Sequence, residues 1–151
     1  MPLPYWGGEG EGLPAMLRTI IIDDEPHIRD TLRKLLARHC PQVSVIGEAS
    51  GVADGIRAIK KLHPELVLLD INLEDGTAFD LLHSLNSVDF KIIFISACDK
   101  TTIQAIKLNR LEFLTKPVNP DELIAAVKHA GKSDPHDMAL KLQAFEVNVR
   151  K

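Results

Sequence analysis

The feature that most constrains this chain is an unbroken apolar run, Leu66-Val67-Leu68-Leu69, that ends in an acid, Asp70. Such a run is typical of a strand that is buried on both faces, as strands of parallel sheets are. In open parallel sheets, ligands bind outside the carboxyl ends of the strands. We therefore expect Asp70 to lie at the edge of the sheet where a ligand would bind.

Four further stretches have the composition of strands, and helical stretches separate them. Apolar or β-branched runs predict strands at 19–22, 43–49, 92–96 and 111–114. Apolar residues at helical spacing predict five helices, which begin near Pro26, Val52, Phe79, Ile103 and Pro120. Strands and helices that alternate in this way favour an α/β fold with a parallel sheet and helices on both faces. We expect a flavodoxin-like doubly wound sheet of five strands, in the order 2-1-3-4-5, with five flanking helices.

The helix ends carry their own signals. Pro26 suits the first turn of the first helix, and Pro41 follows its end. That helix is expected to turn one face inward: Ile28, Leu32, Leu35, Leu36 and His39. Asn119 is expected to cap the last helix, with Pro120 at its first position, and Gly131 is expected to end it.

The predicted topology brings polar residues at four strand ends into one crevice. Asp23 and Asp24 follow the first strand, Asp70 ends the third, and Ser96 and Lys116 follow the fourth and fifth. Taken singly, a strand-end Asp caps a helix, a Ser forms a turn, and a Lys lies on the surface. Because all of them meet in one topology, we interpret the set as a site.

Three carboxylates in one crevice repel one another, which a divalent cation would relieve. Mg²⁺ prefers oxygen ligands and binds one or two carboxylates together with water and phosphate oxygens. Asp24 and Asp70 are the expected direct ligands, with Asp23 acting through water and the backbone carbonyl of Asn72 as a further ligand. Asp70 could then attack a phosphorus atom and form an acyl phosphate. Lys116 would offset charge on the phosphoryl oxygens, and Ser96 would donate a hydrogen bond to one of them.

Four segments of the chain resemble the receiver domain of two-component response regulators. They read IIIDDEP at 20–26, LVLLDIN at 66–72, IIFISA at 92–97 and FLTKPV at 113–118. The resemblance covers about residues 17–130. It implies a role for each site residue: phosphoacceptor for Asp70, acidic metal pair for Asp23 and Asp24, switch hydroxyl for Ser96, essential lysine for Lys116, and aromatic switch for Phe113. It also implies a cis bond between Lys116 and Pro117.

The same resemblance implies partners and regulation. A sensor histidine kinase would donate the phosphoryl group, and phosphorylation would switch the face of helix 4, strand 5 and helix 5 for homodimerisation or effector control. The domain would catalyse its own phosphorylation and dephosphorylation, as a signalling switch rather than a turnover enzyme. The run RLEFLTKP resembles the class that carries a LytTR-type DNA-binding domain. Transcription regulation through an output domain is thus expected, with no contact to nucleic acid through this chain itself.

The sequence departs from the family pattern in the loop after Asp70, and it leaves other functions open. Glu74 stands where the family usually has Pro, and Ala78 where it often has Gly. One alternative is a receiver-like interaction module that is never phosphorylated. A Mg²⁺-dependent phosphatase would resemble DxDxT after the first strand, whereas Asp-Ile-Asn follows the third here. A flavin-binding flavodoxin-like domain is disfavoured because Asp23 and Asp24 would repel a phosphate.

Composition fits a single soluble domain. The chain has 151 residues, 45% of them apolar, and a formal net charge of −3, so no large basic surface for nucleic acid follows. No apolar run approaches the length of a membrane span, and residues 1–15 lack the features of a signal peptide. Cys40 and Cys98 form no metal-ligand pair and are expected to be reduced. We expect a cytoplasmic protein that does not bind membranes.

The domain boundaries follow from changes in composition. Residues 1–15 are rich in Gly, Pro and Glu and are expected to be a disordered extension. The receiver domain is expected at 16–130. Residues 131–151 are expected to form a linker and a short helix with an apolar stripe of Met138, Leu142, Phe145 and Val149. That helix either packs on the domain or leads to an output domain absent from this chain.

Overall fold

A computed structural model describes residues 16–97, 104, 106 and 111–132 of the chain. Its main sheet has five parallel strands in the order β2-β1-β3-β6-β7. The strands are β1 (Leu17–Ile22), β2 (Val43–Ala49), β3 (Leu66–Asp70), β6 (Lys91–Ser96) and β7 (Glu112–Thr115). This is the predicted flavodoxin-like order, which confirms the fold expected from the sequence.

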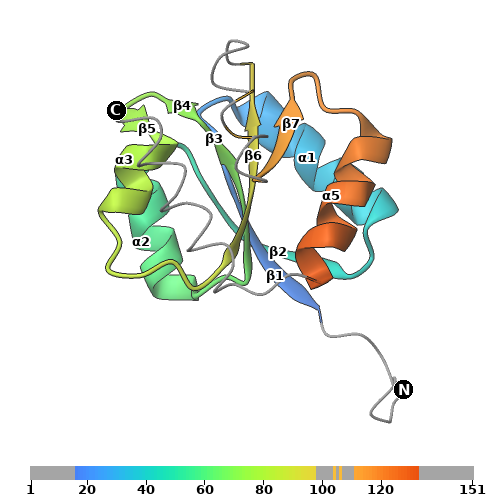
Figure 1. The fold of residues 1–151 in the computed structure, drawn as a ribbon, viewed down its shortest axis with the longest axis horizontal. Helices are drawn as coiled ribbons and strands as arrows, with labels where there is room; N and C mark the ends of the chain where they lie inside the picture. The colour runs from blue at the N-terminus through green and yellow to red at the C-terminus, as the bar shows by residue number, and fades with distance from the viewer. Residues whose placement is uncertain (1–15, 98–103, 105, 107–110, 133–151) are drawn as a thin grey trace, which may run out of the picture.

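Helices cover both faces of the sheet. Helices α2 (Val52–Leu62) and α3 (Ala78–His83) lie on one face, and α1 (Pro26–His39) and α5 (Pro120–Lys132) lie on the other (Figure 1). The helix expected near Ile103 falls outside the described residues, except for positions 104 and 106. Ile106 is fully buried, in the core cluster on the side of α2 and α3.

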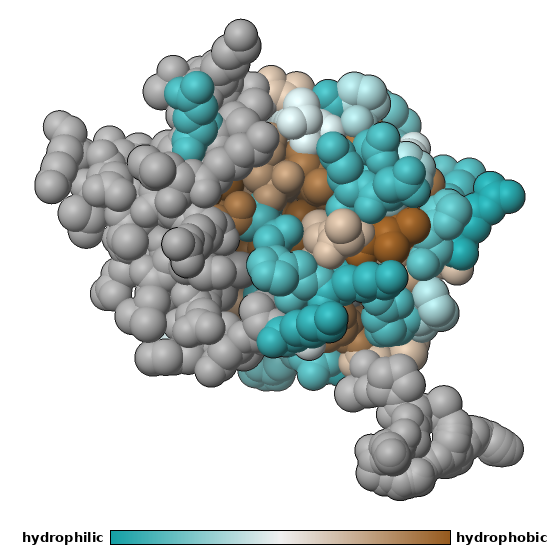
Figure 2. Space-filling model, turned by 45° about the vertical axis from the view of Figure 1, so that its right-hand side comes forward, coloured by the Kyte–Doolittle hydropathy of each residue, from teal (hydrophilic) through white to brown (hydrophobic). Residues whose placement is uncertain are grey.

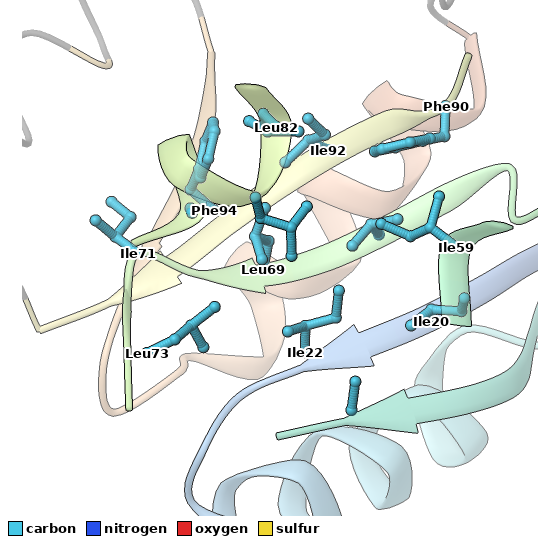
Figure 3. Close-up of a cluster of buried hydrophobic side chains, with 14 of the residues drawn as sticks. Ile20, Ile22, Ile59, Leu69, Ile71, Leu73, Leu82, Phe90, Ile92 and Phe94 are labelled. Carbon is cyan, nitrogen blue, oxygen red and sulfur yellow. The ribbon is translucent and has the colours of Figure 1, made fainter. Parts of the chain in front are cut away.

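The two faces of the sheet carry separate cores because side chains alternate along each strand. Ile20 and Ile22 pack on the side of α2 and α3, in the cluster drawn in Figure 3, whereas Ile21 packs against α1 and α5. Strand β3 is buried along its whole length, as its unbroken apolar run predicted. Its central position places Asp70, its last residue, at the middle of one edge of the sheet.

Two expectations about helix ends are wrong, and one is confirmed. Asn119 Oδ1 accepts hydrogen bonds from the backbone N–H groups of Asp121 (2.8 Å) and Glu122 (3.2 Å), as predicted for the cap of α5. His39, the last residue of α1, is exposed, whereas the residue that follows it, Cys40, is 1% exposed and has a free thiol. Gly131 does not end α5, which runs on to Lys132.

A small hairpin that the sequence did not predict follows β3 directly. Strands β4 (Asn72–Leu73) and β5 (Gly76–Thr77) pair antiparallel, with Asn72 opposite Thr77 and Leu73 opposite Gly76. Gly76 has a φ of 148°, a backbone conformation that residues with a side chain rarely adopt. The segment after Asp70, which the sequence analysis treated as a loop, is therefore paired β structure.

Candidate functional site

An acidic cluster lies at the carboxyl ends of β1 and β3, which are neighbours in the sheet. Carboxylate oxygens of Asp23, Asp24, Glu25 and Asp70 can all be found within 4.8 Å of one another. Asp23 and Asp70 are buried, at 1% and 4% exposed, whereas Glu25 lies at the surface. Glu25 was not among the predicted site residues. The third consecutive acid of the Asp-Asp-Glu run was the signal that could have suggested it.

Lys116 supplies the positive charge at the centre of this cluster. Its Nζ lies 2.9 Å from Asp23 Oδ2, 2.9 Å from Asp70 Oδ2 and 3.4 Å from Glu25 Oε2. The backbone holds Lys116 in place, because its N–H donates to the carbonyl of Ser96 on the neighbouring strand (3.1 Å). The bond from Lys116 to Pro117 is cis, as the family resemblance implied.

The proximity of these groups changes their proton affinities. Burial raises the pKa of the Asp23 carboxyl, and the nearby Asp70 charge acts in the same direction. The N–H of Glu25, which donates to Asp23 Oδ1 at 2.8 Å, and the ammonium of Lys116 oppose this rise. Burial by itself would lower the pKa of Lys116, but the Asp23 and Asp70 carboxylates outweigh it and raise that pKa. Lys116 therefore stays charged at neutral pH.

The donor set fits a hard divalent cation. Asp23 Oδ2 is buried and forms an ion pair with Lys116, whose ammonium also faces Asp70 and Glu25. One ammonium among these carboxylates leaves negative charge in excess, and buried charges of this kind are stable only when a cation offsets them. Asp23, Asp24 and Asp70 could hold Mg²⁺, which prefers such oxygen ligands and leaves positions for water or phosphate oxygens.

Asn72 is joined to the acceptor carboxylate through its backbone. Its N–H donates to Asp70 Oδ1 at 3.3 Å, while Lys116 Nζ is hydrogen-bonded to the other oxygen, Asp70 Oδ2. The two oxygens of Asp70 are therefore held by different segments of the chain. This leaves the carboxylate in a fixed orientation at the end of β3.

The remaining predicted residues lie on β6, which is next to β3, and on β7, which pairs with β6 at the edge of the sheet. Ser96, the last residue of β6, is 2% exposed and pairs with Thr115 across the sheet. Phe113 on β7 is partly buried and packs against the core cluster on the side of α2 and α3. Cys98, which follows Ser96 closely, lies outside the described residues. The predicted strand endings thus meet at one edge of the sheet.

Comparisons with known proteins agree with this geometry. The model of the response regulator receiver domain family matches residues 19–128. An uncharacterised response regulatory protein of Vibrio vulnificus is 35% identical over 80% of this chain and 50% of its own length. The sensory transduction protein LytT of Bacillus anthracis is 31% identical over 89% of this chain and 55% of its own length. The receiver domain of the putative response regulator NarL from Mycobacterium tuberculosis superposes with a TM-score of 0.68, at 27% identity, covering 80% of this chain and 99% of that one.

The chain belongs to the response regulator receiver domain family of two-component systems, since the family model covers most of its length. It spans about half the length of the curated relatives it matches. The similarity of this chain to LytT agrees with the resemblance of its RLEFLTKP segment, around β7, to the LytTR class. Within the described residues, no helix is long and apolar enough to cross a membrane.

Proposed function

We propose that this chain is a phosphorylation switch in which Asp70 accepts a phosphoryl group from a phosphohistidine of a sensor histidine kinase. The observation that carries the proposal is the arrangement around Asp70. Its carboxylate is buried at the carboxyl end of the central strand, 2.9 Å from Lys116 Nζ, within a cluster of acids suited to Mg²⁺. The lysine and the acids come from separate strand ends, so a merely local structural role does not account for them together.

The reaction is a phosphoryl transfer between two side chains. An oxygen of the Asp70 carboxylate attacks phosphorus, the P–N bond of the phosphohistidine breaks, and the imidazole leaves with the electron pair and takes a proton from water. Lys116 interacts with the equatorial oxygens, and Ser96 donates a hydrogen bond to one of them. Bound Mg²⁺ would offset the charge that gathers between the phosphoryl oxygens and the carboxylates of Asp23, Asp24 and Asp70. Water later hydrolyses the acyl phosphate and restores Asp70.

The switch acts on the face formed by β7 and α5, together with the segment before β7. A groove of about 410 Å³ lies between these two elements and is lined by residues that include Phe113, Glu122, Ala125 and His129. Figure 2, which brings the α5 side of the molecule forward, shows apolar surface between hydrophilic side chains. Movement of Ser96 and Lys116 toward the new phosphoryl oxygens, with rotation of Phe113, would change this face. A second copy of the chain, or an effector, would bind the changed face.

The regulated output lies beyond this chain. The receiver runs from residue 16 to Lys132, where α5 ends, and the residues after it connect it to an output domain of the LytTR class that binds DNA. This assignment is supported by the RLEFLTKP segment and by the similarity to LytT over half of that protein's length. In this arrangement the receiver regulates transcription from the cytoplasm and does not touch DNA itself.

Intact mass spectrometry tests the proposal directly. The wild-type chain and Asp70→Asn are incubated with acetyl phosphate and Mg²⁺, and in parallel with EDTA. One added phosphoryl group, of about 80 Da, is expected on the wild type with Mg²⁺ only, and none on the variant. If the wild type takes up no group and also binds no beryllofluoride, the acceptor role is wrong, and the domain is an interaction module that is not phosphorylated.

A further inference from the structure

Asp75, at the tip of the hairpin that follows Asp70, caps a helix far away in the sequence. Its Oδ1 accepts a hydrogen bond from the backbone N–H of Val52 at 2.6 Å, and its Oδ2 accepts one from Ala53 at 3.2 Å. These are the first two residues of α2. Both N–H groups hold the pKa of the Asp75 carboxyl below its ordinary value, as expected for a carboxylate at a helix N-terminus.

Helix α2 has no cap of its own that could replace this contact. The residue before it is Gly51, which has no side chain to accept a hydrogen bond from the first turn. A Cβ atom at Gly51 would lie 2.5 Å from Asp75 Oδ1, so the close approach of Asp75 requires a glycine there. The end of α2 is therefore shaped to receive the hairpin.

The other end of the hairpin is joined to the phosphoryl site. Asn72, its first residue, donates its N–H to Asp70 Oδ1, and the N–H of Ala78 donates to the carbonyl of Ile71 at 2.8 Å. Ile71 and Leu73 are 4% and 8% exposed and pack into the core beside Leu69 and Ile22 (Figure 3). The segment between Asp70 and α3 is thus held on both sides, by the core and by α2.

We propose that Asp75 is a positioning residue for the phosphoryl site: by capping α2, it fixes the hairpin so that Asn72 is held against Asp70. Asn72 then keeps its N–H on one acceptor oxygen, and its carbonyl, the expected metal ligand, is limited to a narrow range of positions. This inference rests on the proposed function, because it assigns Asp75 to the same site. A cap that served only to stabilise α2 would leave the affinity for Mg²⁺ unchanged.

The test therefore measures Mg²⁺ binding by the full chain, with isothermal titration of MgCl₂, rather than phosphorylation alone. Asp75→Ala removes both hydrogen bonds from the hairpin side. Val52→Pro removes the shorter bond from the helix side, because proline lacks the N–H and suits the first position of a helix. Gly51, with φ −165° and ψ −169°, is extended and so accepts a following proline.

Asp54→Asn is the matched control for the charge that Asp75→Ala removes, whereas Val52→Pro changes no charge. Asp54 is an exposed acid in the first turn of α2, so its replacement removes one negative charge near the same helix end. Asp54 interacts with Ser50 and Arg57, and not with the hairpin. A change in Mg²⁺ affinity that arises only from lost charge would appear in this control as well.

We expect Asp75→Ala to weaken Mg²⁺ binding by about 10-fold, the lower end of what substitutions behind a metal ligand cost. Val52→Pro should have a smaller effect in the same direction, and Asp54→Asn should stay within about 2-fold of the wild type. The Ala78 amide donates its hydrogen bond to the Ile71 carbonyl at the base of the hairpin. Its hydrogen exchange should accelerate in Asp75→Ala and in Val52→Pro. If Asp75→Ala is too unstable to titrate, Val52→Pro alone decides the outcome.

Three results would overturn the inference, and they are distinguishable. If Asp75→Ala and Val52→Pro keep the wild-type affinity for Mg²⁺ and only their free energy of unfolding is lower, Asp75 is a simple helix cap. An equal loss in Asp54→Asn would attribute the effect to charge. If the wild type neither binds Mg²⁺ nor accepts a phosphoryl group, the proposed function itself fails and removes the basis of this inference. If the wild type binds Mg²⁺ and accepts a phosphoryl group, and the variants keep the wild-type affinity for Mg²⁺, only the proposed role of Asp75 is rejected and the proposed function stands.

Discussion

Charged side chains have different structural roles at the two ends of the main sheet. At the carboxyl ends of the strands, which we call the site end, Asp23 and Asp70 are buried beside the ammonium of Lys116. At the amino ends, Arg18 is exposed, and its guanidinium donates to the carbonyls of Leu62 and His63 at the end of α2. The first arrangement concentrates negative charge in a buried place, whereas the second satisfies backbone carbonyls that would otherwise lack a partner.

Helix α2 links these two regions, because a distant residue holds each of its ends. Asp75 binds its first N–H groups at the site end, and Arg18 binds its last carbonyls at the opposite end. The hairpin that carries Asp75 contacts Asp70 directly through the N–H of Asn72, whereas Arg18 lies at the amino end of β1, away from the site. Two contacts with similar structural roles should therefore differ in their influence on the site, and substitutions can separate them.

The largest effect on stability is expected from Lys116→Met. The change removes the ammonium that lies 2.9 Å from both Asp23 and Asp70, and the buried carboxylates then face one another. Removing one partner of a buried ion pair costs about 3 kcal/mol in free energy of unfolding. Chemical denaturation in EDTA measures this loss, and added Mg²⁺ should recover part of it, because the cation offsets the same charges.

Lys60→Met provides the control for that experiment, since Lys60 is an exposed lysine on α2 away from the acidic cluster. Its effect should stay within about 0.5 kcal/mol. Equal stability of Lys116→Met and the wild type in EDTA would show that the ammonium does not hold the site end together. The buried charges at the site end would then contribute no more to the free energy of unfolding than the exposed contacts at the opposite end.

A smaller effect, confined to stability, is expected from Arg18→Ala at the opposite end. Loss of the hydrogen bonds to Leu62 and His63 should lower the free energy of unfolding by about 1 kcal/mol, since the contact is exposed. Arg18→Lys should restore little, because a single ammonium lacks the planar fork that reaches two carbonyls. Affinity for Mg²⁺ should stay at the wild-type value. A loss as large as that of Asp75→Ala would mean that the two ends of α2 cannot be separated.

The sequence predicted those parts of the molecule that depend on short stretches of chain. Strand β3 is recognisable because a strand buried on both faces must be apolar throughout. The flavodoxin-like strand order was predicted from the alternation of strands and helices, and this order brings Asp23, Asp70 and Lys116 together. Asn119 was predicted as the cap of α5 because its partners are two and three residues away.

The parts that were missed depend on contacts between distant residues. The hairpin has strands of two residues, too short for alternation to be visible, and it is held by Asp75, whose partner Val52 is 23 residues earlier. Gly131 looked like a helix end, but that role needs a positive φ, which it does not have. Helical spacing placed His39 inward, but the spacing does not show where the last turn of α1 unwinds.

The smallest effect is expected in the pH dependence of the cap on α2. The N–H groups of Val52 and Ala53 lower the pKa of Asp75 from its ordinary value of 3.8. A carboxyl whose pKa is lowered by folding adds stability above its unfolded pKa, and this contribution is lost as the pH falls through the folded pKa. The stability difference between the wild type and Asp75→Asn should therefore be complete near neutral pH and shrink as the pH falls below 3.8.

Asn119→Ala supplies the comparison, because the cap of α5 is an amide that does not titrate. Its stability difference from the wild type, about 1 kcal/mol, should not change over the same pH range. Urea denaturation of the three proteins in EDTA measures both differences without a contribution from metal. If the Asp75→Asn difference is as constant as that of Asn119→Ala, the charge of Asp75 plays no part in the cap, and the hairpin is held to α2 by neutral hydrogen bonds and packing alone.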